Sequence, residues 1–267
     1  MIIGNKDFDI SKTYIMGILN VTPDSFSDGG KFNNIDSALA HCEEMINDGA
    51  AIIDVGGEST RPGYTQISVS EEIERVAPVI ESIKKHFDVP VSLDTYKSSV
   101  AEAGIRAGAD LINDIWGLKY DKEMAALIAK YGKPCCIMHN RDNTDYKNFP
   151  EDILSDLQES IEIALNAGIS DENIILDPGV GFAKTLEQNL LVVKNLDIFH
   201  KLGYPLLLGT SRKSLIGLTL DLPKDERMEG TLATSVLAAW QKYMFVRVHD
   251  VKENYRAVAM TSAIFNA

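Results

Sequence analysis

The chain has 267 residues, 45% of them hydrophobic and 24% charged, which is the composition of an ordinary globular protein. The net charge of -13 argues against nucleic acid and against an anionic membrane as a partner. No apolar run approaches the ~18 residues that cross a bilayer, and the first fifteen residues mix Asp and Lys with apolar residues, unlike a signal peptide. The three cysteines, Cys42, Cys135 and Cys136, form no CxxC pair, so we expect buried free thiols and a cytoplasmic location.

A repeated pattern of an amphipathic stretch, a glycine and a short apolar run organises the sequence. Gly49, Gly108 and Gly168 each separate such segments, and glycine is the usual residue just after a helix. The apolar runs predict eight strands, at about residues 14–20, 51–55, 90–94, 110–113, 134–138, 173–177, 205–209 and 244–249. The stretches between them predict helices near residues 35–48, 70–86, 97–107, 121–130, 151–167, 186–201, 229–242 and 251–264.

Eight strand–helix units in one chain predict a single (β/α)8 TIM barrel over residues 1–267. A doubly wound open sheet is the alternative, but no GxGxxG fingerprint follows the first strand. Pro78 inside the second helix predicts a kink or a later helix start. In a TIM barrel the active site lies at the C-terminal ends of the strands, so the residues there are the first functional candidates.

Two carboxylates end apolar strands. Asp94 closes Val91–Asp94 and Asp177 closes Ile174–Asp177, and both are expected to point into the mouth of the barrel. Carboxylates accept hydrogen bonds, so the pair suits a heterocycle with an edge of N–H donors, and Asn113 can both donate and accept. The alternative is that each Asp only caps the following helix.

Cations follow the last two strands. Arg247 and His249 alternate with valines and therefore share the inward face of the last strand, beside the start of a helix. They predict an anion site, unless Arg247 is paired with an acidic neighbour. Lys213 follows the seventh strand, where it could form a Schiff base or act as a fixed cation.

The first two strand–helix loops carry many turn-forming residues. The loop at 20–30 has eleven residues, beyond the usual two to six, which predicts a functional loop that closes over the site. The loop at 56–63 places hydroxyl and guanidinium groups, including Thr60 and Arg61, beside small residues that allow close approach to a phosphate.

Seven motifs in this order carry a resemblance to a known family: MGILNVTPDSFSDGG, DVGGESTRPG, SLDTYK, INDIWG, ILDPGVGFAKT, GTSRKSLIG and RVHDV. They resemble the successive motifs of the dihydropteroate synthases, which are pterin-binding TIM barrels, and they cover residues 16 to 251. The resemblance implies a transferase of tetrahydrofolate biosynthesis that joins 6-hydroxymethyl-7,8-dihydropterin diphosphate to 4-aminobenzoate, releasing diphosphate. It also implies Mg2+ as cofactor, small molecules as substrates, a homodimer, and sulfonamides as competitors of 4-aminobenzoate.

The resemblance assigns roles to individual residues. Asp94, Asn113, Met138, Asp177 and Lys213 match the family's pterin pocket, with Asp94, Asp177 and Lys213 catalytic. The diphosphate is expected at Asn20, Thr60, Arg61, Arg247 and His249, with the magnesium at Asn20. The 4-aminobenzoate is expected at Phe26, Pro62, Phe182 and Ser214.

Loss of diphosphate from the pterin methylene would leave a delocalised cation, so the resemblance implies a dissociative, SN1-like substitution. A methyltetrahydrofolate:corrinoid methyltransferase is the nearest alternative; it would share Asp94, Asn113 and Asp177 but has no use for a diphosphate site. An aldolase or isomerase that uses Lys213 and a non-catalytic pterin-binding protein are more distant alternatives.

Overall fold

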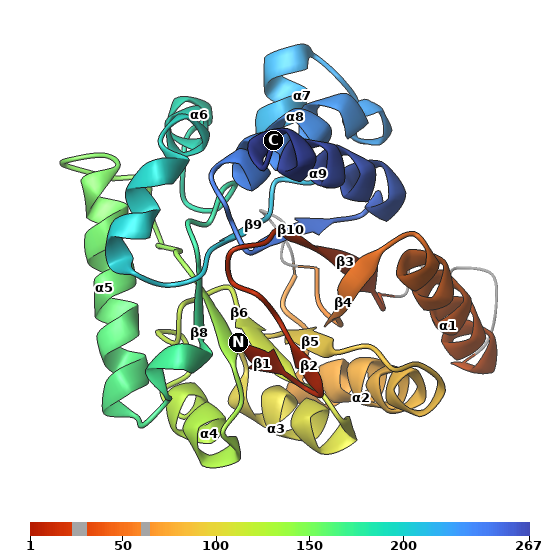
Figure 1. The fold of residues 1–267 in the computed structure, drawn as a ribbon. Coiled ribbons are helices and arrows are strands. Elements are labelled where there is room, and N and C mark those ends of the chain that lie inside the picture. The colour runs from red at the N-terminus through yellow and green to blue at the C-terminus, as the bar shows by residue number, and fades with distance from the viewer. Residues whose placement is uncertain (23–30, 60–64) are drawn as a thin grey trace.

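Parallel strands closed into a ring form the centre of the protein (Figure 1). The computed structural model describes residues 1–22, 31–59 and 65–267. The strands of the ring are β3 (Tyr14–Asn20), β4 (Ala50–Gly56), β5 (Val91–Asp94), β6 (Leu111–Asp114), β7 (Cys135–Met138), β8 (Ile174–Asp177), β9 (Leu207–Leu208) and β10 (Phe245–Val248). Their order is β8-β7-β6-β5-β4-β3-β10-β9, and an isolated parallel bridge between Leu176 and Leu206 joins the two ends. The predicted (β/α)8 barrel is therefore confirmed, and the open sheet is wrong.

Strand register sets the depth of the polar residues in the barrel. Asn20 is in register with Gly56, Gly56 with Asp94, and Asp94 with Asn113. Because successive residues alternate between the two faces of a strand, residues in register point to the same side. One row near the C-terminal ends of four neighbouring strands thus carries two amide side chains, one carboxylate and one glycine.

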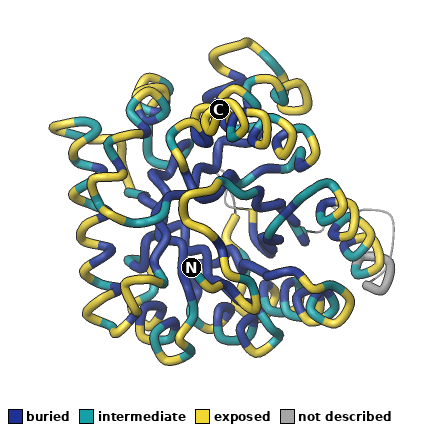
Figure 2. The backbone as a smooth tube through the Cα atoms, viewed as in Figure 1, coloured by how far each residue is buried: buried dark blue, intermediate teal, exposed yellow. Residues whose placement is uncertain are grey.

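Helices cover the outside of the ring, with their exposed faces turned to solvent (Figure 2). They are α1 (Lys31–Asn47), α2 (Val69–His86), α3 (Ser98–Ala107), α4 (Met124–Tyr131), α5 (Glu151–Asn166), α6 (Leu186–Lys194), α7 (Ser214–Leu220), α8 (Met228–Trp240) and α9 (Val251–Phe265). Short 3-10 turns lie at η2 (Asp171–Asn173), η3 (Leu196–Leu202) and η4 (Lys224–Glu226).

Two helix predictions need correction, and one helix was not predicted. The second helix, α2, begins at Val69 and runs through Pro78, so a later start is wrong; Ser68 fixes the beginning by accepting a hydrogen bond from the Glu71 N–H at 3.2 Å. The predicted helix at 186–201 is α6 followed by η3, and α7 was not predicted. Seven residues are too few to give α7 a clear hydrophobic period.

A two-stranded hairpin covers the N-terminal end of the barrel. Its strands β1 (Ile2–Ile3) and β2 (Lys6–Asp7) lie across the centre of the ring in Figure 1. Ile3 and Phe8 are buried there against Met244 and Phe245 inside the barrel. This apolar packing closes one end, so the polar strand ends at the other end are the place for a ligand.

A larger apolar layer lies between the strands and the helices. Cys135 belongs to this outer layer and Cys136 to the inner one, and both are buried free thiols, as is Cys42. Within the described residues, no helix combines the length and the apolar character that a membrane span requires.

Candidate active site

An arginine and two carboxylates form the floor of the mouth. Arg247 donates from Nε to Asp54 Oδ2 at 2.6 Å and from Nη2 to Asp94 Oδ2 at 2.7 Å. Asp54 is fully buried in β4 and also accepts from Ser92 Oγ at 2.5 Å. The proposed pairing of Arg247 with acidic neighbours is therefore present, but the neighbours are themselves part of the site.

Asp94 keeps one oxygen free. Its Oδ1 is buried and has no hydrogen-bond partner among the described residues, although its Oδ2 binds Arg247. Burial raises the pKa of Asp94 to about 7, against the lowering effect of Arg247. A buried acceptor without a donor is costly, so this oxygen is placed to receive an N–H group from a ligand.

Asp177 and Lys213 face each other across Gly209. A Cβ on Gly209 would lie 3.7 Å from Asp177 Oδ2 and 3.8 Å from Lys213 Nζ, so the glycine leaves the space between them open. Asp177 Oδ1 accepts from the Gly179 N–H at 2.7 Å, and Lys213 Nζ donates to the Val180 carbonyl at 2.5 Å. Burial raises the pKa of Asp177 and lowers that of Lys213 to about 8, the latter against the opposing effect of Asp177.

His249 is held in one orientation by Ser211. The Ser211 hydroxyl accepts from the His249 backbone N–H at 3.1 Å and lies 2.9 Å from His249 Nδ1. Burial and then the charge of Arg247 lower the pKa of His249 to about 3, so the ring is neutral at pH 7. We assign the Ser211 proton to Nδ1, which leaves the ring proton on Nε2 as a donor.

Asn20 lies near Asp94 and near His249. A Cβ on Gly56 would be 3.9 Å from Asn20 Oδ1 and 3.9 Å from Asp94 Oδ2. Asn20 and His249 also line one cavity of about 680 Å3 between β3, α1 and α9. Within the described ranges, no group of three or more His, Cys, Asp and Glu side chains is arranged to hold a metal ion.

Apolar side chains form one wall. Met138 at the end of β7 is buried with Tyr96 and Ile115, and Phe182 packs against this cluster. The Lys213 ammonium lies 4.7 Å from the centre of the Phe182 ring, within the range of a cation–π contact.

The structure brings together most of the predicted residues. Asp94, Asn113, Asp177, Lys213 and Arg247 converge on the mouth, and Asn113 Nδ2 lies 3.5 Å from Asp54. Neither Asp94 nor Asp177 caps a helix: Lys97 holds the N-cap position of α3 and Thr185 that of α6. Ser214 is the exposed first residue of α7, directly after Lys213. Phe26, Thr60, Arg61 and Pro62 lie outside the described residues.

Two members of the site, Asp54 and Ser211, lie among the strand-end candidates of the sequence, Asp54 to Glu58 and Ser211 to Lys213, but were assigned no role there. Asp54 belongs to β4 and precedes the strand end by two residues, so its strand position alone does not reveal its ion pair with Arg247. An Asp inside the apolar run of residues 50–55 was the available signal, because a buried carboxylate needs a partner. Ser211 acts through His249, so its strand-end position alone does not reveal its role.

The fold and this pocket define the class as a TIM barrel with charged and amide side chains gathered at the C-terminal ends of its strands, where the active sites of such barrels lie. The model of the family described as pterin binding enzyme matches residues 16–249. The chain belongs to this family of pterin-binding enzymes and, within it, to the dihydropteroate synthases.

The relatives are similar over nearly their whole length. The dihydropteroate synthase of Clostridium beijerinckii is 65% identical over 99% of both chains, and that of Bacillus subtilis is 56% identical over 96% of this chain and 90% of its own. A crystal structure of dihydropteroate synthase from Clostridium difficile, determined in the presence of pteroic acid, superposes with a TM-score of 0.95, 52% identity and coverage of 98% and 100%. The Yersinia pestis enzyme with a sulfonamide drug complex gives a TM-score of 0.94 at 42% identity, covering 100% of this chain and 99% of its own. These relatives favour the synthase over the corrinoid methyltransferase.

Proposed function

We propose that this protein condenses 6-hydroxymethyl-7,8-dihydropterin diphosphate with 4-aminobenzoate to give 7,8-dihydropteroate and diphosphate. Among the described residues, the observation that carries the proposal is the buried, unpartnered Oδ1 of Asp94, on the same pocket as Asn113, Asp177 and Lys213. That pocket continues directly into Arg247, which shares Asp94. One ligand with an N–H edge and an anionic tail accounts for both halves.

The pterin ring occupies the carboxylate half. Asp94 and Asp177 accept from the ring N–H groups, and Asn113 pairs with neighbouring donor and acceptor atoms. Lys213 donates to ring acceptor atoms, because the reaction offers no ketone or aldehyde for a Schiff base. The two buried anions also stabilise positive charge that develops on the ring.

The diphosphate occupies the cationic half. The two ion pairs of Arg247 use Nε and Nη2, so the described residues leave Nη1 for a further acceptor. His249 adds its Nε2–H as a donor, because the hydrogen bond from Ser211 to Nδ1 keeps the ring proton on Nε2. Burial alone would lower the pKa of Arg247, but Asp54 and Asp94 raise it, so the charge is permanent.

The residues present are compatible with magnesium. Asn20 offers a hard carbonyl oxygen beside the anion site, and Mg2+ commonly takes one or two protein oxygens, with substrate phosphate and water completing its shell. Asn20 would hold it together with the diphosphate. Bound there, the ion would neutralise charge that develops on the departing diphosphate.

We propose a dissociative order of events. The bond from the pterin methylene to the diphosphate breaks first, because the ring delocalises the resulting cation between two fixed carboxylates. The neutral amine of 4-aminobenzoate then attacks the methylene and needs no strong base. Phe182 and Ser214 flank Lys213 and form the described part of the 4-aminobenzoate site.

Calorimetry tests whether the two halves bind different parts of the substrate. Asp177→Asn should lower the affinity for hydroxymethyl pterin by about 10-fold or more, since a charge-assisted acceptor is lost. The affinity for diphosphate alone should stay unchanged. His249→Ala should do the reverse. Equal losses for both ligands in both variants would contradict the proposed division.

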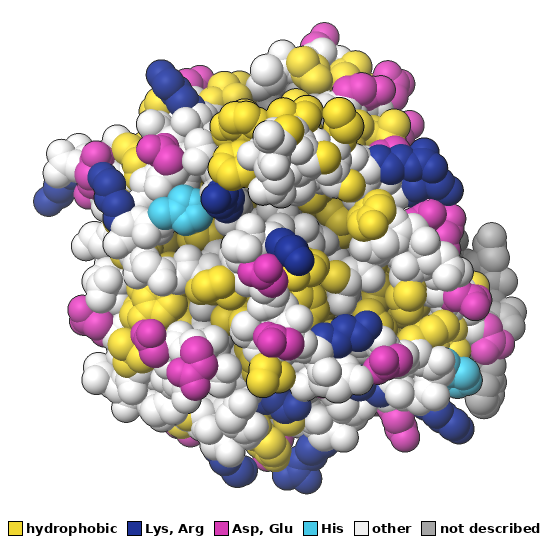
Figure 3. All heavy atoms as spheres, viewed as in Figure 1, with side chains coloured by type: hydrophobic (Ala, Val, Ile, Leu, Met, Phe, Trp, Pro, Cys, Tyr) yellow, Lys and Arg dark blue, Asp and Glu magenta, His cyan; other side chains and the backbone are white. Residues whose placement is uncertain are grey.

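We further propose a homodimer that forms through α8 and α9, in a cytoplasmic protein. Leu237 and Trp240 on α8 and Met260, Ile264 and Phe265 on α9 are large apolar residues with exposed fractions of 42–62%. Figure 3 shows hydrophobic side chains gathered over this part of the molecule. A contiguous exposed apolar patch of this kind marks an interface.

Sedimentation tests this dimer. Leu237→Lys should shift the protein toward the monomer mass, whereas Leu190→Lys, at a similarly exposed leucine on α6, should not. A monomeric unmodified protein, or a dimer that tolerates Leu237→Lys, would contradict the proposed interface.

A further inference from the structure

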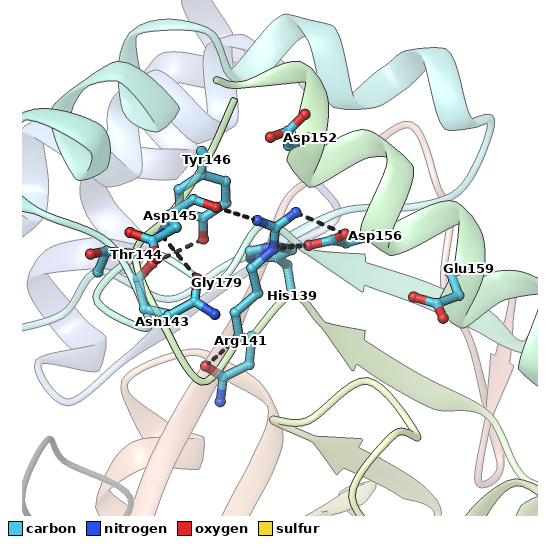
Figure 4. A network of polar contacts seen from close by, with 12 residues as sticks. His139, Arg141, Asn143, Thr144, Asp145, Tyr146, Asp152, Asp156, Glu159 and Gly179 are labelled. Carbon is cyan, nitrogen blue, oxygen red and sulfur yellow. Dashed lines mark hydrogen bonds and ion pairs between the residues drawn. The ribbon is translucent and has the colours of Figure 1, made fainter. Parts of the chain in front are cut away.

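A chain of polar side chains runs from α5 to the loop that follows β8. Asp156 on α5 accepts from His139 Nε2 at 2.9 Å and from Arg141 through both Nε and Nη2. Figure 4 shows His139 and Arg141 turned toward Asp156. His139 is almost fully buried at the end of β7, and none of the sequence motifs assigns it a role.

Lys184 is the next member of the chain. Its Nζ donates to His139 Nδ1 at 2.8 Å, to the Gly179 carbonyl at 2.9 Å and to the Phe182 carbonyl at 3.1 Å. The three hydrogens of the ammonium are therefore all used, and every acceptor is uncharged. A lysine that binds two carbonyls of one loop acts as a clasp on that loop.

The clasped loop, residues 178–185, touches the proposed active site at several points. The N–H of Gly179 binds Asp177, and the Val180 carbonyl binds Lys213. The ring of Phe182 lies under the Lys213 ammonium. Gly179 has φ +69°, and a Cβ there would meet the His139 carbonyl oxygen at 1.9 Å, so the loop packs directly on His139.

We propose that Lys184, oriented by His139 and Asp156, is a positioning residue that fixes this loop and so places Phe182 for the second substrate. The inference rests on the proposed function, because it assigns the Phe182 side of the pocket to the aromatic amine. Lys184 itself touches neither the pterin carboxylates nor Lys213 by a hydrogen bond. Its effect passes through the backbone at residues 179 and 182.

The hydrogen bonds fix the protonation states along the chain. With Lys184 charged, its ammonium can only donate, so His139 Nδ1 accepts and Nε2 carries the proton given to Asp156. Burial lowers the pKa of His139 to about 4, which keeps the ring neutral near pH 7. A protonated His139 would put a donor against Lys184 and break the clasp.

Lys184 is held in place by geometry rather than by a direct ion pair. Burial lowers its pKa to about 7, while Asp177 and Asp156 favour its charge and Lys213 and Arg141 oppose it. The contacts of Lys184 with two carbonyls and one imidazole therefore fix its orientation.

Steady-state kinetics of Lys184→Met is the first test. We expect the KM for 4-aminobenzoate to rise about 10-fold, since hydrogen bonds from a charged donor are lost. The Kd for hydroxymethyl pterin should rise less than this KM, because Asp94 and Asn113 on other strands also hold the ring, although the loop contacts Asp177 and Lys213. Lys194→Met, at an exposed lysine on α6, is the matched control and should leave both values unchanged.

Two substitutions of His139 give a sharper test that does not need the lysine variant to fold. His139→Asn keeps an acceptor near the Nδ1 position, facing Lys184, whereas His139→Gln keeps a donor near the Nε2 position, facing Asp156. We expect the Asn variant to retain the KM for 4-aminobenzoate within about threefold and the Gln variant to resemble Lys184→Met. Equal KM values in the Asn and Gln variants, or an unchanged KM in a folded Lys184→Met, would overturn the proposal. Failure of the unmodified protein to couple the two substrates would instead overturn the proposed function.

Discussion

Arg247 is the single residue that links the two halves of the proposed site. It compensates two buried carboxylates through its ion pairs with Asp54 and Asp94, and in the proposed function it also supplies positive charge for the diphosphate. A buried charge pair that loses one partner leaves the other uncompensated, which is strongly destabilising. The role of Arg247 in binding is therefore coupled to its role in the fold.

Arg247→Ala should lower the affinity for diphosphate by about 10- to 150-fold, because a charge-assisted contact is worth about 1.5–3 kcal/mol. The affinity for hydroxymethyl pterin should fall less, through the altered charge of Asp94. Calorimetry with each ligand separates the two effects. Arg106→Ala, which removes an exposed arginine on α3, should change neither affinity. A larger loss for the bare pterin than for diphosphate would contradict the assignment of Arg247.

Asp94 should make pterin binding depend on pH. Its pKa is raised to about 7 by burial, so the anion that accepts the ligand N–H disappears as the pH falls through that value. The Kd for hydroxymethyl pterin should therefore rise about tenfold for each pH unit well below 7, as expected for one proton. Asp94→Asn should bind weakly at all pH values and lose this dependence. A Kd in the unmodified protein that stays flat from pH 8 to pH 5 would show that Asp94 is not the acceptor.

The strand-end rule predicted Asp94, Asn113, Asp177, Lys213 and Arg247 because each follows a recognisable apolar run. It could not predict the ion pairs of Arg247, since Asp54 and Arg247 are separated by 193 positions and meet only because β4 and β10 both pair with β3. The carboxylates that Arg247 contacts depend on the register between neighbouring strands, and the sequence of a single strand does not determine that register.

Among the elements, the eight strands of the barrel were predictable, including the two-residue β9 within the apolar run 205–209, whereas the N-terminal hairpin and α7 were not. The strand β3 has seven residues and a clear apolar pattern, whereas β1 and β2 have two residues each and no period to detect. The hairpin they form nevertheless has a defined task, because its apolar side chains fill the end of the barrel opposite the site.

Phe8→Ala should separate stability from catalysis. Phe8 is buried against Tyr14, with ring centres 5.0 Å apart, and against Phe245. Its loss should lower the free energy of unfolding by about 3–5 kcal/mol through the cavity it leaves. The kcat/KM of the folded variant should stay within about twofold, since the mouth lies at the other end. Ile10→Ala, at an exposed position, should cost less than about 0.5 kcal/mol, and a severe loss of kcat/KM in Phe8→Ala would contradict this division.

The whole molecule separates its tasks between the two ends of one barrel. Apolar residues close the N-terminal end, and charged side chains from β4, β5, β8 and β10 meet at the C-terminal end. In the proposed function, a protein with a net charge of -13 binds an anion locally, because Arg247 and Lys213 are half-buried among fixed partners there. The excess of negative charge discourages other polyanions.

Release of diphosphate from 6-hydroxymethyl-7,8-dihydropterin diphosphate, measured with and without 4-aminobenzoate in the presence of Mg2+, tests the proposed function most directly. We predict that 4-aminobenzoate strongly increases release and that each diphosphate released is matched by one 7,8-dihydropteroate. Asp177→Asn should slow both products equally, because the same carboxylate binds the ring and stabilises its cation. Release that is independent of 4-aminobenzoate, or binding of the pterin diphosphate without any release, would contradict the account.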